Sequence, residues 1–183
     1  QHLVDVAADH LGQFDFVVHS VAWAPLEDLH GRVTDSSTEG FLRAMRISCH
    51  SFAELARCSE PYLASSASLM TMTYLGAEEA VENYGMMGPV KAALESVVRY
   101  MAAELGPNGH RVHAISPGPV PTRAASGLQD FDHLMQKAVE RSPLRRLVTL
   151  QEIGNLAVFL ASDASSGMTG QTLYIDGGYH IVN

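Results

Sequence analysis

Two phenols and one amine stand close together in the middle of the chain, in the stretch from Thr71 to Lys91. They are Tyr74, Tyr84 and Lys91, and we expect them where a strand end runs through a loop into a helix. If that helix begins near Tyr84, the seven-residue spacing places Tyr84 and Lys91 two turns apart on one face. A phenol beside an ammonium group can donate a proton, because the nearby charge favours its anion and its hydroxyl can hydrogen-bond a developing oxyanion.

The same spacing also fits an ordinary helix start, in which a buried Tyr and a surface Lys take no part in chemistry. The neighbouring methionines, Met86, Met87 and Met101, are more typical of a core or a pocket wall than of a reactive group. The elements around the Tyr and Lys residues therefore have to decide between the two interpretations.

Length and composition indicate one globular domain spanning residues 1–183. Apolar residues make up 46% of the chain and charged residues 17%, which suits a folded protein with a sizeable core. The formal charge of −8, with no basic patch in the sequence, argues against nucleic-acid binding.

Cysteine and histidine placement bears on the compartment and on metal binding. Cys49 and Cys58 fall nine residues apart in one expected helix, a spacing that does not suit a disulfide, so we expect a reducing cytoplasm. No apolar run reaches transmembrane length, and we expect no membrane association. His110 and His113 do not form a zinc-like pattern with carboxylates or thiols, so no metal site is expected.

Apolar patterning predicts strands that alternate with helices along the whole chain. The run at 14–20 (FDFVVHS) is nearly continuous, as in a parallel strand buried on both faces. This alternation predicts an α/β fold with a doubly wound parallel sheet. The expected strands are 14–20, 65–74, 111–116 and 172–175, and the expected helices are 1–12, 36–58, about 84–105, 131–139 and 149–160.

Local signals mark two helix starts and one ligand-binding edge. Ser36 with Glu39, and Thr149 with Glu152, have the spacing of capping boxes. The loop at 21–34 follows the carboxyl end of the first strand, where open α/β sheets bind their ligands.

Several stretches of this sequence resemble the short-chain dehydrogenase/reductase family, and more narrowly its bacterial enoyl-acyl-carrier-protein reductases. The resemblance covers nearly the whole chain and implies a Rossmann-like fold. It rests on VVHSVAWAP at 17–25, on the long run TMTYLGAEEAVENYGMMGPVK…SPGP at 71–119, on TRAASG at 122–127 and on DASSGMTGQTLYIDGG at 163–178.

The spacing of the Tyr and the Lys is the most discriminating part of the resemblance. Most short-chain dehydrogenases place the catalytic Tyr four residues before the Lys, a position occupied here by Met87. The enoyl reductases place it seven residues before, which is Tyr84, with a second Tyr ten residues earlier, which is Tyr74. The sequence therefore resembles the enoyl reductases rather than the wider family.

The resemblance implies a role for each residue. Tyr84 would hydrogen-bond the thioester carbonyl and stabilise the enolate, Lys91 would hold the nicotinamide ribose, and Tyr74 would line the same pocket. The cofactor would be NADH or NADPH, and it would be contacted by Ser20, Val21, Ala22, Lys91, Val120 and Thr122. For Ser20 and Ala22 a plain strand-end role, and for Thr122 a turn or capping role, remain open alternatives.

One part of the family pattern does not occur in these residues. Family members begin with a strand, a Gly-rich turn and a helix that bind the pyrophosphate, whereas the first strand here resembles the fourth of the family. We therefore expect an N-terminally truncated fold with an exposed edge at 14–20. Either the sequence is an incomplete record of a whole reductase, or a short protein exists that associates with another subunit.

The expected activity is the NAD(P)H-dependent reduction of trans-2-enoyl thioesters on acyl carrier protein in fatty acid synthesis. A homotetramer is also implied, with interfaces at helices 38–58 and 84–105 and at the C-terminal strand region. Two alternatives stay open: a short-chain reductase of another carbonyl or enoyl substrate, and a non-catalytic fragment or interaction subunit.

Overall fold

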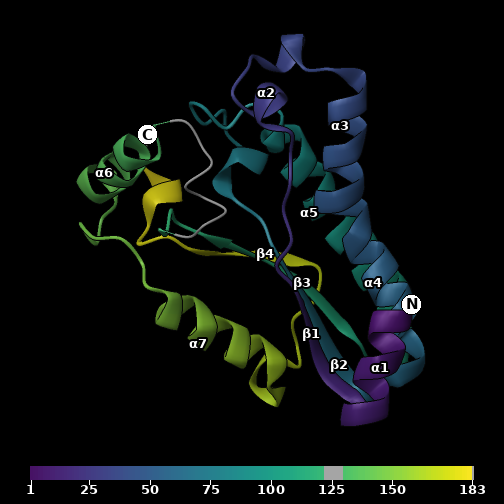
Figure 1. The fold of residues 1–183 in the computed structure, drawn as a ribbon. Helices are drawn as coiled ribbons and strands as arrows, with labels where there is room; N and C mark the ends of the chain where they lie inside the picture. Colours follow the sequence, from purple (N-terminus) through teal and green to yellow (C-terminus); the bar gives the residue numbers. More distant parts are fainter. Residues whose placement is uncertain (122–129, 183) are drawn as a thin grey trace.

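The computed structural model describes residues 1–121 and 130–182, which form one four-stranded sheet flanked by helices (Figure 1). Neighbouring strands all pair in parallel, in the order β1-β2-β3-β4. The expected α/β architecture is therefore confirmed. The strands are β1 (Phe14–His19), β2 (Leu63–Met72), β3 (Arg111–Pro117) and β4 (Gln171–Ile175).

Helical segments connect the strands, as the crossovers of a parallel sheet require. Within residues 1–121 and 130–182, no helix is both long and apolar enough to cross a bilayer. The α-helices are α1 (His2–Leu11), α2 (Leu26–Leu29), α3 (Thr38–Met45), α4 (Ser51–Ser59), α5 (Met87–Leu105), α6 (Phe131–Arg141) and α7 (Leu150–Ala161). Short turns are η1 (Val33–Asp35), η2 (Arg46–His50), η3 (Glu60–Tyr62), η4 (Leu75–Ala77), η5 (Gly106–Asn108), η7 (Asp163–Ser165) and η8 (Tyr179–Ile181).

The sheet has a hydrophobic core on each face. Helices α3, α4 and α5 lie on one side of it and α7 on the other (Figure 1). Leu69 points into the core under α4 and α5, whereas its neighbour Met70 points into the core under α7, and both are fully buried. This alternation is that of a strand covered on both faces, which is the doubly wound arrangement.

Helix α5 owes its position to a buried stripe that runs along its whole length. The stripe recurs at intervals of three and four residues and comprises Met87, Val90, Lys91, Leu94, Glu95, Val98, Met101, Ala102 and Leu105. The helix ends at η5 and at Gly109, whose φ of 86° is favourable only for a residue without a side chain. Two charged residues, Lys91 and Glu95, occupy core positions of this stripe.

The expected start of α5 near Tyr84 is wrong, because the helix begins at Met87. Asn83 and Gly85 have φ values of 59° and 50°, and this left-handed backbone on both sides of Tyr84 cannot belong to a right-handed helix. Tyr84 therefore lies in a turn before α5. Pro89 falls in the first helical turn, where its missing N–H removes no helical hydrogen bond.

One of the two expected capping boxes forms. Thr149 and Glu152 cap α7 reciprocally, with Thr149 Oγ1 accepting from the Glu152 N–H at 3.2 Å and Glu152 Oε2 accepting from the Thr149 N–H at 2.8 Å. The box expected from Ser36 and Glu39 is wrong, because Ser37 caps α3 by accepting from the Gly40 N–H at 3.0 Å. Ser36 and Ser37 are adjacent, so the sequence alone left the N-cap position of α3 uncertain by one residue.

Strand β1 is an edge strand among the described strands, and the expectation that it is buried on both faces is wrong because residues on one of its faces are exposed. It pairs with β2 alone among the described strands, and the side chains of Phe16 and Val18 are 54% and 41% exposed. The exposed edge expected from the sequence is confirmed.

The helical segment expected over 36–58 contains a π-helical turn, η2 (Arg46–His50), between α3 and α4. A π turn inserts one residue into a helix and rotates the side chains that follow it, and such turns are frequent at functional sites. Here η2 packs against α5, and Ser48 and Cys49 are buried.

Candidate functional site

The expected site residues that the structure describes lie at the edge of the sheet where the carboxyl ends of all four parallel strands meet. The exposed residues Ser20, Val21 and Ala22 follow β1, Tyr74 follows β2, and the half-buried Val120 follows β3. Thr122 and the TRAASG stretch at 122–127 lie outside the described residues. The fold thus brings segments from three strands to one place.

The two phenols pack against each other. The rings of Tyr74 and Tyr84 are 4.9 Å apart and meet edge to face at 61°. Tyr84 is only 8% exposed, and its ring lies over Gly76 so closely that a Cβ added there would approach Tyr84 Cδ1 to 2.4 Å. Gly76 therefore makes room for the buried phenol.

The turn that carries Tyr84 is held from the other side by α2. A Cβ added at Gly85 would lie 2.9 Å from the carbonyl oxygen of Leu29, so only glycine allows this approach and this positive φ. Gly88 in the first turn of α5 approaches the Gly76 carbonyl in the same way, at 2.9 Å from an added Cβ. These glycines explain the local sequence Tyr-Gly-Met-Met-Gly: the turn is fixed by close backbone contacts.

Lys91 is buried and points at the end of β2. Its side chain is 5% exposed, and Nζ donates to the Met72 carbonyl at 2.7 Å. Burial lowers the pKa of Lys91 from 10.5 to about 8, while Cys49 and Glu95 nearby oppose that change. An ammonium group has three N–H donors, so two remain for a ligand after the bond to Met72. The interpretation of Lys91 as a surface residue is therefore wrong.

Burial also dominates the acidity of both phenols. It raises the pKa of Tyr84, and the neighbouring Tyr74 and Glu95 raise it further. The pKa of Tyr74 is raised mainly by burial and then by Tyr179 and Asp176. The expectation that nearby charge favours the Tyr84 anion is thus wrong for the free chain, and both phenols stay neutral as hydrogen-bond donors.

A hydrogen-bond network fixes the carboxyl end of β1. His19 is buried, with Nδ1 3.0 Å from Thr71 Oγ1 and Nε2 2.8 Å from Ser51 Oγ. Its pKa is lowered by burial and by the charge of Lys91, so the imidazole is neutral at pH 7. His19 is therefore a satisfied residue at the end of β1.

The π-helical turn braces the loop that follows β1. Ser48 Oγ accepts from the Trp23 N–H at 2.7 Å and donates to the Trp23 carbonyl at 2.8 Å. One side chain thus satisfies both backbone groups of a residue that lies directly after Ser20 to Ala22. Only the register shift of η2 gives Ser48 this direction, so no local pattern could have predicted it.

Glu95 and Thr73 are two site residues that the sequence interpretation did not single out. Thr73 Oγ1 donates to Glu95 Oε1 at 2.6 Å, and both side chains are buried. The signal for Glu95 was present, since it occupies a core position of α5 one turn after Lys91. Thr73 had no signal, because its role depends on a contact between the residue after β2 and α5.

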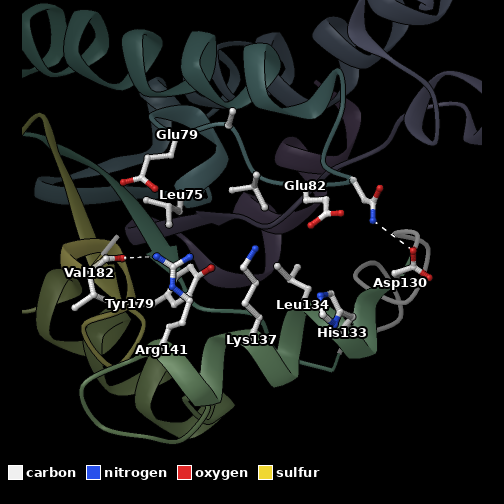
Figure 2. A pocket seen from close by; sticks show the side chains of 13 residues that line it. Leu75, Glu79, Glu82, Asp130, His133, Leu134, Lys137, Arg141, Tyr179 and Val182 are labelled. Atoms are coloured by element: carbon white, nitrogen blue, oxygen red, sulfur yellow. Dashed lines mark hydrogen bonds between the residues drawn. The ribbon is translucent and has the colours of Figure 1, made fainter.

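A small cavity of about 90 Å³ lies between α6 and the turn after β2, with Tyr179 among its lining residues (Figure 2). Lys137 and Arg141 of α6 line it from one side, and Glu79 and Glu82 from the other. Its volume is below the ~300 Å³ of ordinary ligand pockets, so it does not by itself form a substrate site. Among the described residues no group of three His, Cys, Asp or Glu side chains could hold a metal.

This arrangement allows a phenol to donate a hydrogen bond or a proton to an oxyanion at the same edge of the sheet as the ammonium group of Lys91. The neutral phenol of Tyr84 is the donor, and Lys91 supplies N–H groups and positive charge at the same edge of the sheet. Met87, which takes the usual Tyr position of short-chain dehydrogenases, is a core residue that is 5% exposed.

Residues 1–180 match the family model described as enoyl-(acyl carrier protein) reductase. The chain belongs to this family. Among its relatives, the NADH-dependent enoyl-[acyl-carrier-protein] reductase 1 of Rhizobium meliloti is 45% identical over 171 residues, which are 93% of this chain and 63% of that protein. The NADPH-dependent FabI of Staphylococcus aureus is 44% identical over 94% of this chain and 67% of its own length.

Solved structures of the family have the same fold as this chain. The Bacillus cereus enoyl-acyl carrier protein reductase, solved with NADP+ and indole naphthyridinone, matches with a TM-score of 0.96 and 41% identity over 100% of this chain and 71% of that one. The reductase of Anaplasma phagocytophilum in complex with NAD matches with a TM-score of 0.94 and 44% identity, over 100% and 70%. This chain therefore spans roughly two thirds of the length of its relatives, from 63% to 71%.

Proposed function

We propose that this protein reduces the trans-2 double bond of enoyl thioesters carried on acyl carrier protein, with NADH or NADPH as the reductant. The observation that carries the proposal is that the packed Tyr74–Tyr84 pair and the buried Lys91, which donates to the Met72 carbonyl at the end of β2, lie at the edge of the sheet where α/β folds bind their ligands. Membership of the enoyl-(acyl carrier protein) reductase family supports the substrate class.

The residues present suit the nicotinamide end of a dinucleotide. Lys91 retains two N–H donors after its bond to Met72, which suits the two hydroxyls of a ribose. Ser20, Val21 and Ala22 lie exposed in the loop next to this edge. We propose that these residues and Val120 contact the cofactor, together with Thr122, which lies outside the described residues. When bound, the cofactor supplies the hydride.

In this proposal the chain's own residues stabilise the charge that develops on the substrate. Tyr84 donates a hydrogen bond to the thioester oxygen as it becomes an enolate oxygen, and its neutral state at pH 7 makes it a donor. Lys91 keeps the surroundings of that oxygen positive. Tyr74 packs on the Tyr84 ring and holds it in one orientation. Burial of the Tyr84 ring excludes water from this position.

The test is nucleotide oxidation with a crotonyl thioester, measured for the parent, Tyr84→Phe and Lys91→Ala. Loss of one oxyanion donor is expected to lower kcat by about 10²–10³-fold in Tyr84→Phe. Tyr100→Phe, at a 70% exposed tyrosine on the same helix, is the matched control and should keep parental activity. Reduction of a ketoacyl thioester but never of an enoyl thioester would favour the other short-chain reductases and refute the proposal.

A second candidate is a binding role without catalysis, favoured by the exposed edge of β1 with Phe16 and Val18 on its surface. Isothermal calorimetry separates the two. Binding of NADH or NADPH supports the enzyme, whereas no binding of either, together with a stable complex with another subunit, supports the binding role.

We further propose a cytoplasmic homotetramer. Both cysteines are free, which suits a reducing compartment. Leu42 on α3 is 62% exposed, on one of the helices expected at interfaces. The net charge of −8 is unfavourable for nucleic-acid binding. Light scattering after size exclusion gives the mass of the assembly, and a monomer would refute the tetramer.

A further inference from the structure

Helix α5 buries two charged side chains, and the proposed chemistry uses only one of them. Lys91 and Glu95 are each 5% exposed and stand four residues apart in the buried stripe. A buried carboxyl group is costly unless hydrogen bonds satisfy it, so a carboxyl group at a core position calls for a reason.

The contact of Glu95 leads directly into the site. Glu95 Oε1 accepts from Thr73 Oγ1 at 2.6 Å, the short distance of a charge-assisted hydrogen bond. Thr73 is 4% exposed, and its N–H donates to the Ile115 carbonyl of β3 at 2.8 Å. Backbone and side chain of Thr73 are therefore both held, one by the sheet and one by α5.

Thr73 stands between two groups of the site. The residue before it is Met72, whose carbonyl accepts from Lys91 Nζ at 2.7 Å, and the residue after it is Tyr74, which packs on Tyr84 at 4.9 Å. A rotation of the backbone at Thr73 would move the acceptor of Lys91 and the support of Tyr84 together. The Glu95–Thr73 bond opposes that rotation.

We propose that Glu95 is a positioning residue of the Tyr84–Lys91 site, which holds the Thr73 hydroxyl and thereby fixes both the carbonyl that orients Lys91 and the ring that supports Tyr84. This inference rests on the proposed function for its catalytic meaning. The contacts of Glu95, Thr73 and Lys91 are present in the chain without substrate or cofactor.

The charge of Glu95 also acts on Lys91. Lys91 is faced by Cys49 from η2, by His19 from β1 and by Glu95 on α5. Glu95 is faced by Thr73, by Glu78 after β2, by Thr172 of β4 and by Arg99 on α5. Burial raises the pKa of Glu95, and the Thr73 and Thr172 hydroxyls and Arg99 counter that rise. Loss of the Glu95 charge should therefore lower the pKa of Lys91 below about 8.

The chain is well suited to a direct measurement, because it has two lysines, Lys91 and Lys137. Labelling lysine with ¹³C at Cε gives two NMR signals, and Lys137→Arg assigns them. Titration of the Lys91 signal in the free protein reports its pKa without any turnover. A failure of the proposed function, seen as no reduction of enoyl thioesters, leaves this readout intact.

Three variants test the inference. Glu95→Gln keeps the volume and the acceptor but removes the charge, and it should lower the Lys91 pKa by about one unit, the order expected for a charge one helical turn away. Thr73→Val removes the donor at constant volume, which raises the pKa of Glu95 and so lowers that of Lys91. Thr73→Ser restores the donor and should titrate as the parent does.

Turnover gives the second readout. Thr73→Val should lower kcat at least about tenfold through misplacement of Tyr84 and Lys91, and Thr73→Ser should recover it. A merely structural Glu95 would lower the melting temperature of Glu95→Gln and Thr73→Val with no change in the Lys91 titration. That result, or equal kcat values for Thr73→Val and Thr73→Ser, would overturn the inference.

Discussion

Replacing Lys91 with Met should stabilise the fold at neutral pH while abolishing the proposed reduction. The folded chain buries the ammonium group, and burial lowers its pKa from 10.5 to about 8. At about 1.36 kcal/mol per pKa unit, the charged form costs the folded state roughly 3 kcal/mol. Methionine has a similar length and no charge, so it removes that cost and leaves the Met72 carbonyl without its donor, a loss of about 1 kcal/mol. The expected net gain at pH 7 is about 2 kcal/mol.

The sign of the pH dependence is the sharper part of this prediction. Between pH 8 and 10.5 the unfolded chain holds more protons at Lys91 than the folded chain, so parental stability rises with pH in that window. Below pH 8 both states are protonated and the penalty is constant. The advantage of Lys91→Met should therefore shrink by roughly 3 kcal/mol between pH 8 and 10.5.

The assay is urea unfolding at several pH values from 7 to 10.5, with the free energy of unfolding extrapolated to water. Other groups that titrate in this range are common to parent and variant, so the difference isolates Lys91. Lys137→Met controls for the loss of one positive charge elsewhere in the chain. A variant that is less stable than the parent at pH 7, by an amount that does not vary with pH, would refute the reasoning.

Two further predictions concern a buried histidine and a glycine. His113 on β3 is fully buried, and burial and then Arg111 lower its pKa to about 4, so stability should fall by up to about 3 kcal/mol as the pH drops from 6.5 to 4. His113→Leu should flatten that slope in acid unfolding curves, and an unchanged slope would contradict the assignment. Gly76→Ala should displace the Tyr84 ring, at a cost of about 1–3 kcal/mol in stability and a larger loss of turnover. Gly154→Ala, with no atom near the added Cβ, is the control and should gain up to about 1 kcal/mol, whereas equal turnover in both glycine variants would show that the ring is not displaced.

Much of the fold could be predicted from the sequence, because its signals are local. Alternating apolar runs and helical stripes predicted the four strands and the helices between them except the short α2, which lies in the expected loop at 21–34, and the capping box at Thr149 and Glu152 predicted the start of α7. The errors were local as well. Two adjacent serines shifted one cap to Ser37, and two left-handed residues around Tyr84 delayed the start of α5 to Met87.

The candidate site was only partly predictable, since its chemistry depends on burial. The class of reaction was indicated by the resemblance that the spacing of Tyr74, Tyr84 and Lys91 carries, together with Ser20, Val21 and Ala22 after β1. The direction of the pKa changes was not available, because desolvation depends on what the rest of the chain packs around each group. The exposure of β1 was decided in the same way, since the faces of an apolar strand are buried or exposed according to which helices cover them.

The sequence by itself determined the order of the elements, the family resemblance and the residue types available for catalysis. These signals could be read because periodicity and spacing depend only on residues that are close together along the chain. The tertiary structure alone decided that the Tyr84 phenol is neutral, that Lys91 reaches the Met72 carbonyl, and that Glu95 holds Thr73. The last two contacts join the end of β2 and the residue that follows it to α5, across 19 residues in one case and 22 in the other. Such contacts form only when the whole sheet has assembled, and no pattern of neighbours along the chain encodes them.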